Sequence, residues 1–571
     1  MNFLKRLQLN NLSISAWGYI LVVLAIAAPW FIRPGYLFFT DNVWGPNLIL
    51  NWTSSWFLFK FLIRILSFIF PIYFLEKVFI VGVIVLILLG GRRLVNTILE
   101  YCGSQEESGN QSPVSQGLIF ILSLFVLFNP FVYDRALYGQ FGVLVAYGCL
   151  LFVSAYLFRS WQSLDFKYLV QAAMFSAIAL LFSVHFIFLL IPFYLLFLIG
   201  LFLKRRAIKE DKKIKKLGLI LIFSVSIILV INANWLIALA VKASPLANFI
   251  EQGITSRDLV AFQTVGKNGP ETLANVLLMS GFWGKEQSRY LDLTDLSGWQ
   301  RSFILLAPLI FYGLYLSVKR LGHEARLFSF SLILIFTLAV FLAIGIKSLP
   351  TRGLTSFLYD HLPLYKGLRE PQKWVALIIP IYLFYLTLGA RRLMRTKIIV
   401  NNLLLSGFIL GTIIIMQAPS LLWGFNRQVV PTSYPQDWHD VNSLLVNRSD
   451  QSCGRSDRIL FLPWHMYMSF NWARKIIANP AQTFFACPVL SGTNMEWGGI
   501  YDNSRNSDSA IIANWINDKG RSGPPPISGS PIRYIILAKE LDFISYLWLN
   551  DRPYAKPLLE TMTLLVYEIK S

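Results

Sequence analysis

Long apolar runs separated by short polar segments fill the chain from its start to about residue 419. A helix that crosses a lipid bilayer needs about 20 apolar residues. Runs of that kind occur near residues 17–32, 74–91, 117–133, 141–158, 168–184, 186–203, 217–240, 302–318, 327–346, 374–390 and 398–418. The pattern predicts a mainly α protein, a polytopic transmembrane helical bundle of about 11 spans.

One further apolar segment, residues 56–70, has a different character. Lys60 and Arg64 lie four residues apart on it, so a helix would carry both cations on one side. Such a helix is typical of the membrane interface, with its basic side among the lipid headgroups. We expect this segment to lie at the membrane surface and do not count it as a span.

Basic residues predict the orientation of the bundle. With the N-terminus in the cytoplasm, every second loop is cytoplasmic and contains a basic cluster, as the positive-inside rule requires. These clusters are Arg92 and Arg93; Arg159 and Lys167; residues 204–216; Lys319, Arg320 and Arg326; and Arg391, Arg392, Arg395 and Lys397. The chain is therefore expected to be an integral, multi-pass protein of the plasma membrane.

The pattern changes after Pro419 to mixed polar sequence. Strand-like runs occur at 458–462, 533–538 and 564–569, and a helical run at 509–516. We therefore expect two domains, a transmembrane domain over 1–419 and a small extracytoplasmic α/β domain over 420–571. A disulfide between Cys453 and Cys487 would suit an oxidising compartment, but two buried free thiols would give the same sequence, so both readings stay open.

Composition narrows the classes of function. Of the 571 residues, 55% are hydrophobic and only 14% are charged, which indicates that the membrane is the solvent. The net charge of +20 lies in short clusters between apolar runs rather than on one water-exposed face, which argues against nucleic-acid binding. The sequence contains no Walker loop, dinucleotide fingerprint, zinc-type spacing or nucleophile elbow, so ATP-driven transport and hydrolase chemistry lose support.

Asp41 is the first candidate for chemistry. It lies in the first outward loop, just after the first predicted span and among aromatic residues. A carboxylate beside a low-dielectric wall interacts strongly with an approaching hydroxyl or cation, which suits a general base. The alternative is that Asp41 caps the following helix or solvates the loop.

The second outward loop places Asp134, Arg135 and Gln140 within a short connection. Asp134 and Arg135 either serve a site or simply pair with each other. Asp41 and Asp134 together could supply oxygen ligands for a divalent ion such as Mg²⁺ or Mn²⁺. No cofactor is certain from the sequence.

Cations also collect at the outer end of the span near 374–390. Arg369 and Lys373 flank Glu370 there, against the usual preference of cations for the cytoplasmic side. Arginine suits bidentate contact with phosphate and lysine a point-charge contact, so a lipid phosphate is a natural partner. Headgroup anchoring together with an Arg369–Glu370 pair is the alternative. His185 interrupts an apolar stretch at a predicted outer hairpin, and we interpret it as a structural or supporting residue.

These outward motifs resemble the glycosyltransferase C superfamily, and within it a bacterial subgroup of YfhO-like and arabinofuranosyltransferase-D-like proteins. The resemblance covers most of residues 15–375 and fades in the tail. Superfamily members often have two adjacent acids in the first loop, whereas Asn42 follows Asp41 here. The motifs are Phe-Thr-Asp41-Asn, Asn129-Pro-Phe-Val-Tyr-Asp134-Arg135 with Gly139-Gln140, Gly281-Phe-Trp283, and Leu-Arg369-Glu370-Pro-Gln-Lys373-Trp374.

The resemblance implies transfer of a sugar from a polyprenyl-phosphate-linked donor to an extracytoplasmic hydroxyl on a glycan, lipid or protein, with inversion. It implies catalytic roles for Asp41 and Asp134, and donor phosphate contacts from Arg135, Arg369 and Lys373. His185, Gln140 and Glu370 would support them. Trp464, Trp472 and Trp497 would hold the acceptor or form the core of the C-terminal domain.

A non-enzymatic membrane protein is the competing hypothesis. It would be a lipid or glycan transporter, or a scaffold that presents the C-terminal domain. An enzyme should gather Asp41, Asp134 and either Arg369 or Lys373 around one outer cavity. The sequence identifies neither the sugar nor the acceptor.

Overall fold

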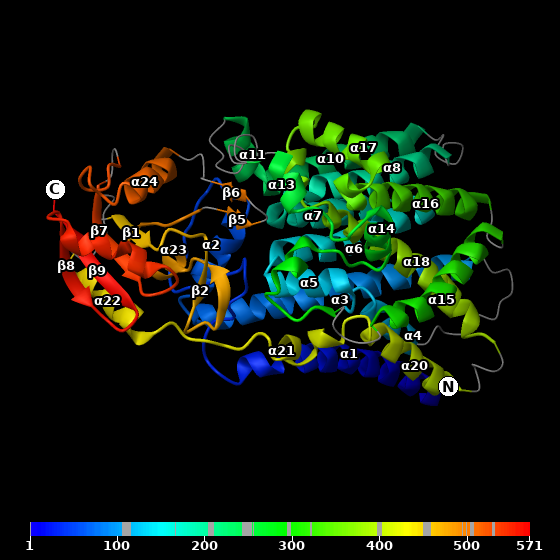
Figure 1. The fold of residues 1–571 in the computed structure, drawn as a ribbon. Helices are drawn as coiled ribbons and strands as arrows, with labels where there is room; N and C mark the ends of the chain where they lie inside the picture. Colours follow the sequence, from blue (N-terminus) through cyan, green and yellow to red (C-terminus); the bar gives the residue numbers. More distant parts are fainter. Residues whose placement is uncertain are drawn as a thin grey trace.

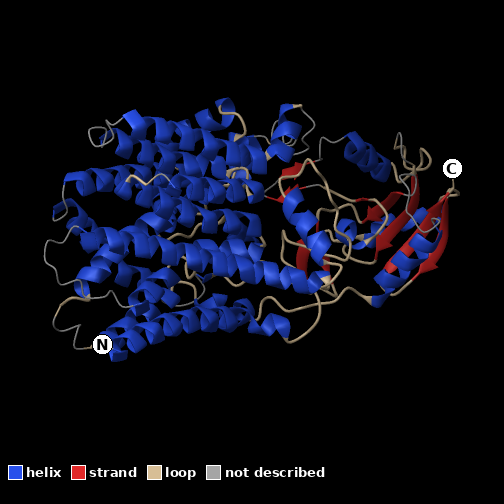
Figure 2. Cartoon of the chain, turned by 180° about the vertical axis from the view of Figure 1, so that it is seen from behind, coloured by secondary structure: helices blue, strands red, loops and turns tan. Residues whose placement is uncertain are grey.

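The computed structural model describes residues 2–104, 116–165, 167–203, 211–241, 254, 256–293, 299–319, 323–396, 402–448, 458–493, 495–497, 500–502, 507–527 and 531–570. The chain forms a long helical bundle with the strands gathered at one end, and the N-terminus lies at the opposite end (Figures 1 and 2). A mainly helical fold with a small C-terminal sheet region is confirmed.

The long axis of the molecule is built by apolar helices. They are α1 (Asn2–Phe31), α3 (Ile72–Ser104), α4 (Gln116–Leu124), α5 (Pro130–Tyr138), α6 (Phe141–Ser163), α7 (Lys167–Phe182), α8 (Phe186–Leu203), α10 (Asp211–Ile231), α11 (Ala233–Ala240), α15 (Trp299–Lys319), α16 (His323–Ile344), α18 (Val375–Leu393) and α20 (Leu403–Ile415). Shorter helices connect them: α2 (Phe57–Leu66), α13 (Ser256–Ala261), α14 (Gly269–Leu277), η2 (Trp283–Gln287), η4 (Gly345–Lys347), α17 (Leu349–His361), η5 (Tyr365–Leu368), η6 (Pro371–Trp374), η7 (Pro419–Leu421) and α21 (Leu422–Asn426).

Five helices in the described part of the chain are long and apolar enough to cross a membrane. They are Ile72–Tyr101, Phe141–Ser163, Ser302–Lys319, Arg326–Lys347 and Pro371–Leu393. Two broken pairs, one bent by 79° between α10 and α11 and one by 78° after α20, raise the number to seven if each pair is one span. The expected count of about eleven is therefore not confirmed, because several predicted runs form shorter or bent helices.

The predicted span 117–133 is one of the runs that do not form a single long helix. The helix stops at Leu124, and α5 begins at Pro130 with Asn129 as its N-cap. The Asn129 side chain accepts a hydrogen bond from the amide of Val132 at 3.0 Å, which fixes this new start. Asp134 and Arg135 thus lie on a short buried helix and not in the loop that the sequence predicts.

The centre of the bundle is α18, whose residues from 375 to 391 are buried. It packs against α15 at a very close distance. A Cβ atom added at Gly313 would lie 1.8 Å from the carbonyl oxygen of Tyr385, and one at Gly389 would lie 2.1 Å from that of Leu309. These two glycines are required because they let the two helix backbones touch.

The C-terminal region is built on a five-stranded sheet of order β4-β1-β7-β9-β8. Strand β1 runs parallel to β4 and β7, while β9 is antiparallel to β7 and β8. The elements of the region are α22 (Gln436–Arg448), β1 (Arg458–Leu462), β2 (Tyr467–Phe470), β3 (Lys475–Ala478), α23 (Ala481–Phe484), β4 (Val489–Leu490), β5 (Met495–Trp497), β6 (Ile500–Asp502), α24 (Ser507–Asn517), β7 (Ile532–Ala538), η8 (Phe543–Asp551), β8 (Ala555–Glu560) and β9 (Leu564–Ile569). The predicted strands and helix all coincide with elements of this sheet region.

Two apolar cores cover the two faces of this sheet. Trp472 packs against the core around Trp438, and Trp464 belongs to the core around Trp515. These two tryptophans are therefore core residues, while the side chain of Trp497 lies outside the described part. Cys487 is disulfide-bonded. Its expected partner, Cys453, lies outside the described residues, so that pairing stays a prediction.

Candidate functional site

Asp41 is held by the C-terminal end of α5. Its backbone amide donates to the carbonyl oxygen of Tyr138 at 2.8 Å. Gly139, which follows Tyr138, ends α5 in the left-handed conformation, with φ of 87°. A Cβ atom there would lie 2.8 Å from the backbone nitrogen of Asn42, so glycine allows the loop and the helix to meet. Gly139 thus places the Asp41 loop against the end of α5.

Asp41 opens onto a polar cavity with a volume of about 520 Å³. A hollow of this size accommodates a small ligand group together with water. It lies where the loop between α1 and α2, the start of α6, the turn between α7 and α8, and η6 meet. The lining residues are Asp41, Asn42, Asn51, Thr53, Ser54, Ser55, Trp56, Gly139, Gln140, Gly142, Val143, Phe182, Ser183, Val184, His185, Glu370 and Lys373.

The Asp41 carboxylate has neutral hydrogen-bond donors. Tyr467 donates its hydroxyl to Oδ1 at 2.7 Å, and the Gln140 amide lies 3.4 Å from Oδ2. Asp41 is exposed toward the cavity, although many protein atoms lie around its carboxyl group. The resulting loss of water raises the pKa of Asp41 to about 6, despite the hydrogen bond from Tyr467. Near neutral pH, Asp41 is thus mostly ionised but ready to take a proton.

A cationic cluster forms an adjoining part of the cavity wall, because the Gln140 side-chain nitrogen lies 3.4 Å from Asp41 Oδ2 and 3.5 Å from Glu370 Oε2. The Arg135 side chain is fully buried and pairs with Glu370, and Lys373 Nζ lies 3.2 Å from the other Glu370 oxygen. Arg135 also donates to Gln140 and, at 2.7 Å, to Gln372. Burial by itself would raise the pKa of Glu370, but the charges of Lys373 and Arg135 outweigh it and hold that pKa below its ordinary value.

This wall carries a net positive charge, because two cations share one carboxylate. Lys373 and Glu370 line the cavity, whereas Arg135 lies behind them and acts through Glu370 and Gln140. The guanidinium of Arg135 is also stacked 4.4 Å from the ring centre of Phe282, in the predicted motif around Trp283. The wall can therefore present Lys373 to an anion.

His185 lines the same cavity. Burial and the nearby charge of Lys373 lower the pKa of His185 to about 3, so its ring is neutral. The ring lies against Gly367, where a Cβ atom would come within 2.3 Å of it. A neutral imidazole can donate or accept one hydrogen bond but supplies no charge.

Two predicted site residues lie elsewhere. Asp134 is buried next to Tyr290, whose hydroxyl lies 3.4 Å away, and burial raises the pKa of Asp134 to about 7. Arg369 pairs with Asp258 at 2.9 Å. Neither Asp134 nor Arg369 is among the described residues that line the cavity. The structure thus brings together Asp41, Gln140, His185, Glu370 and Lys373.

The metal hypothesis needs oxygen ligands that converge. Among the described residues, no group of three or more His, Cys, Asp or Glu side chains forms a candidate metal site. Asp134 and Asp41 do not share the cavity. The structure indicates no certain cofactor.

Sequence reasoning missed three residues near Asp41. Tyr467 lies on β2, 426 positions from Asp41, and a contact at that separation cannot be predicted from a local sequence pattern. Arg289 lies with its guanidinium 5.0 Å from the ring centre of Tyr467 and 5.9 Å from that of Tyr138. Both tyrosines follow ordinary core-like patterns in sequence, so their proximity to Asp41 could be found only in three dimensions.

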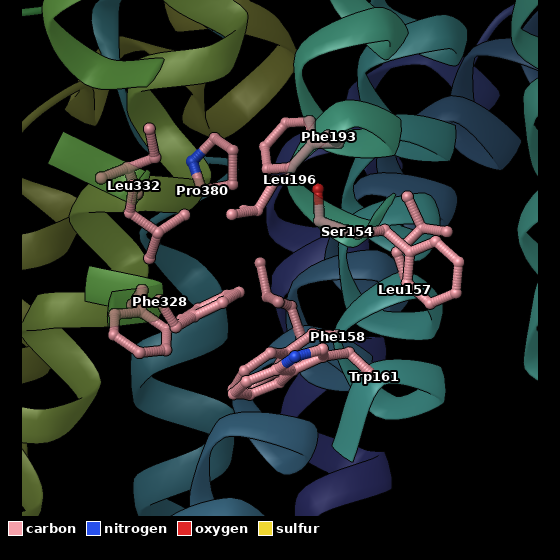
Figure 3. A pocket seen from close by; sticks show the side chains of 13 residues that line it. Ser154, Leu157, Phe158, Trp161, Phe193, Leu196, Phe328, Leu332 and Pro380 are labelled. Atoms are coloured by element: carbon pink, nitrogen blue, oxygen red, sulfur yellow. The ribbon is translucent and has the colours of Figure 1, made fainter. Parts of the chain in front are cut away.

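A second hollow lies deeper in the bundle between α6, α8, α16 and α18, where aromatic side chains face one another (Figure 3). Its lining is almost wholly apolar and includes Phe158, Phe193 and Phe328. Its volume of about 40 Å³ holds no more than a few water molecules. It is a packing gap between helices, and it contains no ionisable group among the described residues.

No known family matches this sequence, and no curated protein matches it. Similar solved structures exist. The arabinofuranosyltransferase AftD from Mycobacteria is 14% identical over 98% of this chain, with a TM-score of 0.51. The oligosaccharyltransferase of Archaeoglobus fulgidus in its apo form is 12% identical over 92% of this chain and 69% of its own, with a TM-score of 0.44. ArnT from Cupriavidus metallidurans is 11% identical over 97% of this chain and 98% of its own, with a TM-score of 0.35.

These comparisons show similarity of fold. The similarity to AftD extends over nearly the whole chain, while the chain spans only 40% of the AftD chain. The expected resemblance is confirmed for the fold, because this chain and AftD share an overall fold.

Proposed function

Starting from the fold shared with an arabinofuranosyltransferase, we propose that this chain is an integral membrane glycosyltransferase. It moves a sugar from a polyprenyl-phosphate-linked donor to the hydroxyl of an extracytoplasmic acceptor. The observation that carries the proposal is one cavity lined by two unlike groups, a carboxylate held by neutral donors and a buried lysine paired with Glu370, which Arg135 also binds. The fold does not favour the transporter or scaffold alternative.

Asp41 is the general base of the proposed reaction. Its Oδ2 removes the proton of the acceptor hydroxyl while the acceptor oxygen bonds to the anomeric carbon. A base with a pKa near the working pH contributes about 10²- to 10⁴-fold in rate, and Asp41 meets that condition. Attack on the face of the anomeric carbon opposite the departing phosphate inverts that carbon.

Lys373 stabilises the leaving group. As the bond between the anomeric carbon and the phosphate oxygen breaks, its electron pair stays on the phosphate, and the Lys373 ammonium meets that charge. Glu370 favours the charged form of Lys373 and holds it in place, while Arg135 holds Glu370 from the other side. Arg369 and Asp134 take no part in this proposed mechanism, because both lie outside the lining of the cavity. The mechanism also includes no divalent metal ion.

The proposal includes the topology. The cavity faces the extracytoplasmic side, where the donor lipid enters from the bilayer, and the helices cross about eleven times when the short and bent ones are included. Residues 420–571 form an extracytoplasmic domain after a transmembrane domain of 1–419. The alternation of basic clusters along the sequence supports this orientation.

The deciding experiment compares Asp41→Asn with Asp360→Asn, an exposed aspartate on α17. Purified full-length protein in lipid nanodiscs is given a panel of radiolabelled pentoses and hexoses on polyprenyl phosphate, with extracted envelope glycans as acceptors. We expect wild type and Asp360→Asn to transfer label and Asp41→Asn to lose at least about 100-fold. Undiminished transfer by Asp41→Asn would remove the base from the mechanism.

A further inference from the structure

We infer that Tyr467, on strand β2 of the C-terminal region, is a positioning residue for Asp41, so that this region completes the cavity instead of only lying beside it. The catalytic meaning of this inference rests on the proposed function of Asp41. Its structural content does not, because it concerns one hydrogen bond between two parts of the chain.

The hydrogen bond from Tyr467 makes the two oxygens of the Asp41 carboxylate unequal. Tyr467 occupies Oδ1 at 2.7 Å, while the hydrogen bond that Oδ2 accepts within the described part of the chain is the long one of 3.4 Å from Gln140. Burial and the charge of Asp41 raise the pKa of Tyr467 well above its ordinary value, so the hydroxyl stays protonated and donates. Oδ2 is left as the oxygen that can receive a proton from a group in the cavity.

The hairpin that carries Tyr467 contacts the loop at two adjacent points. Ala478 lies directly opposite Tyr467 in the β2–β3 pairing. The amide of Ala478 donates to the carbonyl oxygen of Thr40 at 2.8 Å, next to the Tyr467–Asp41 bond. One cross-strand pair of the hairpin thus binds two consecutive residues of the loop, which fixes both the place and the direction of Asp41.

The rest of the loop is also built into the C-terminal region. Phe38 belongs to the core around Trp438, and its ring centre lies 5.1 Å from that of Trp472. The backbone amide of Asn47 donates a hydrogen bond to the carbonyl oxygen of Thr483 at 2.8 Å. The side-chain amide of Asn47 donates to the carbonyl oxygen of Phe485 at 2.7 Å. The hairpin is therefore held against Asp41 by more than the Tyr467 hydroxyl, and removing that hydroxyl should leave the docking intact.

Several charged and titratable groups act on Asp41 from the surrounding elements. Glu370 raises its pKa by repulsion, Arg289 lowers it by attraction, and Tyr138 and Gln140 border it. Lys373 and His185 line the same cavity. Replacing Tyr467 by phenylalanine removes one short hydrogen bond and leaves each of these groups in place. A change in the protonation of Asp41 would then report that bond.

Carbodiimide labelling measures this protonation without any enzyme assay, because carbodiimides react with protonated carboxyl groups. The full chain in nanodiscs is labelled with dicyclohexylcarbodiimide between pH 4 and 9, and modification of the Asp41 peptide is followed by mass spectrometry. Hydrogen bonds to a carboxylate favour its charged form. We expect Tyr467→Phe to move the labelling midpoint upward by about one pH unit.

Two further variants make the result decisive. Tyr567→Phe removes a hydroxyl that bonds Asn550 within the C-terminal region and should leave the midpoint unchanged. Trifluorotyrosine at position 467 keeps the ring and strengthens the donor, so the midpoint should move downward. An unchanged midpoint in Tyr467→Phe or in the fluorinated protein overturns the inference, even if transfer activity falls.

The outcome can be separated from that of the proposed function. If wild type transfers no sugar from any donor but the midpoints move as expected, Tyr467 positions Asp41 and the proposed reaction is wrong. If transfer is found, Tyr467→Phe should lose more rate at pH 6 than at pH 8, since more of its Asp41 is protonated at pH 6. An equal loss at both pH values would indicate a structural role and contradict the inference.

Discussion

Two carboxylates share one cavity in this protein, and their surroundings differ. Asp41 has neutral hydrogen-bond donors and a raised pKa, whereas Glu370 pairs with two cations and has a lowered pKa. The same chemical group is thus ready to accept a proton on one wall and permanently charged on the other. Such a separation of pKa values within one site is how acid–base roles are distributed among carboxylates. The comparison teaches that Asp41 suits chemistry and Glu370 suits charge balance.

The largest effect should come from breaking the charged wall. In Glu370→Gln the fully buried Arg135 loses its anionic partner, and an unpaired buried charge costs about 3–5 kcal/mol. The free energy of unfolding, followed by thermal denaturation in detergent, should fall by that amount. Glu286→Gln, an exposed substitution on η2, is the control and should leave it unchanged. Equal stability of both variants would mean that Gln140 and Gln372 suffice for Arg135.

A smaller effect should follow from removing the cation that faces the cavity. Lys373→Met leaves the Arg135–Glu370 pair in place but deletes the contact proposed for the donor phosphate. A hydrogen bond to a charged group is worth about 1.5–3 kcal/mol, so kcat/KM for the polyprenyl-phosphate donor should fall about 10- to 100-fold, with part of the loss in kcat. Lys366→Met, on the neighbouring η5, should not change kcat/KM. Similar kcat/KM values in both variants would place the phosphate elsewhere.

The pH profile sharpens the comparison from the Asp41 side. A base acts in its ionised form, so transfer should be full above the pKa of about 6 and fall about tenfold per pH unit below it. Glu370 stays ionised throughout this range and should contribute no step. Initial rates between pH 4.5 and 8.5 test this. A flat profile down to pH 5 would assign the proton transfer to another group.

The smallest effect should come from Asp134→Asn. Asp134 has a raised pKa like Asp41, but it is not among the described residues lining the cavity. Transfer should change by no more than about threefold, which is less than 1 kcal/mol. The measurement is kcat under saturating donor. A loss as large as that of Asp41→Asn would show that the two carboxylates act together after all.

Sequence reasoning identified the helices and strands because hydrophobic periodicity determines them locally. It did not identify where apolar runs bend. In the run 217–240 the break is at Asn232, whose side chain donates to the carbonyl of Ala177 and accepts from the Trp235 ring nitrogen at 2.7 Å. A single polar residue in an apolar run carries no such information until its partner from another helix is known.

The site shows the same limit. The motifs located Asp41, Gln140, Glu370 and Lys373, and these four share the cavity. The motifs did not predict that Arg135 pairs with Glu370, 235 positions away, or that Arg369 pairs with Asp258. Pairing among buried charges depends on how separate helices pack, so adjacent residues such as Arg369 and Glu370 can belong to different networks.

The hairpin contact with the Asp41 loop also has a consequence for the order of events during synthesis. Residue 41 leaves the ribosome long before residue 467, and at about 5–20 residues per second the delay is on the order of tens of seconds. Through that interval the early helices can enter the bilayer while the loop waits for its partner strand. A nascent chain therefore carries an unfinished centre until the residues of strand β2 have been synthesised and have folded against the loop.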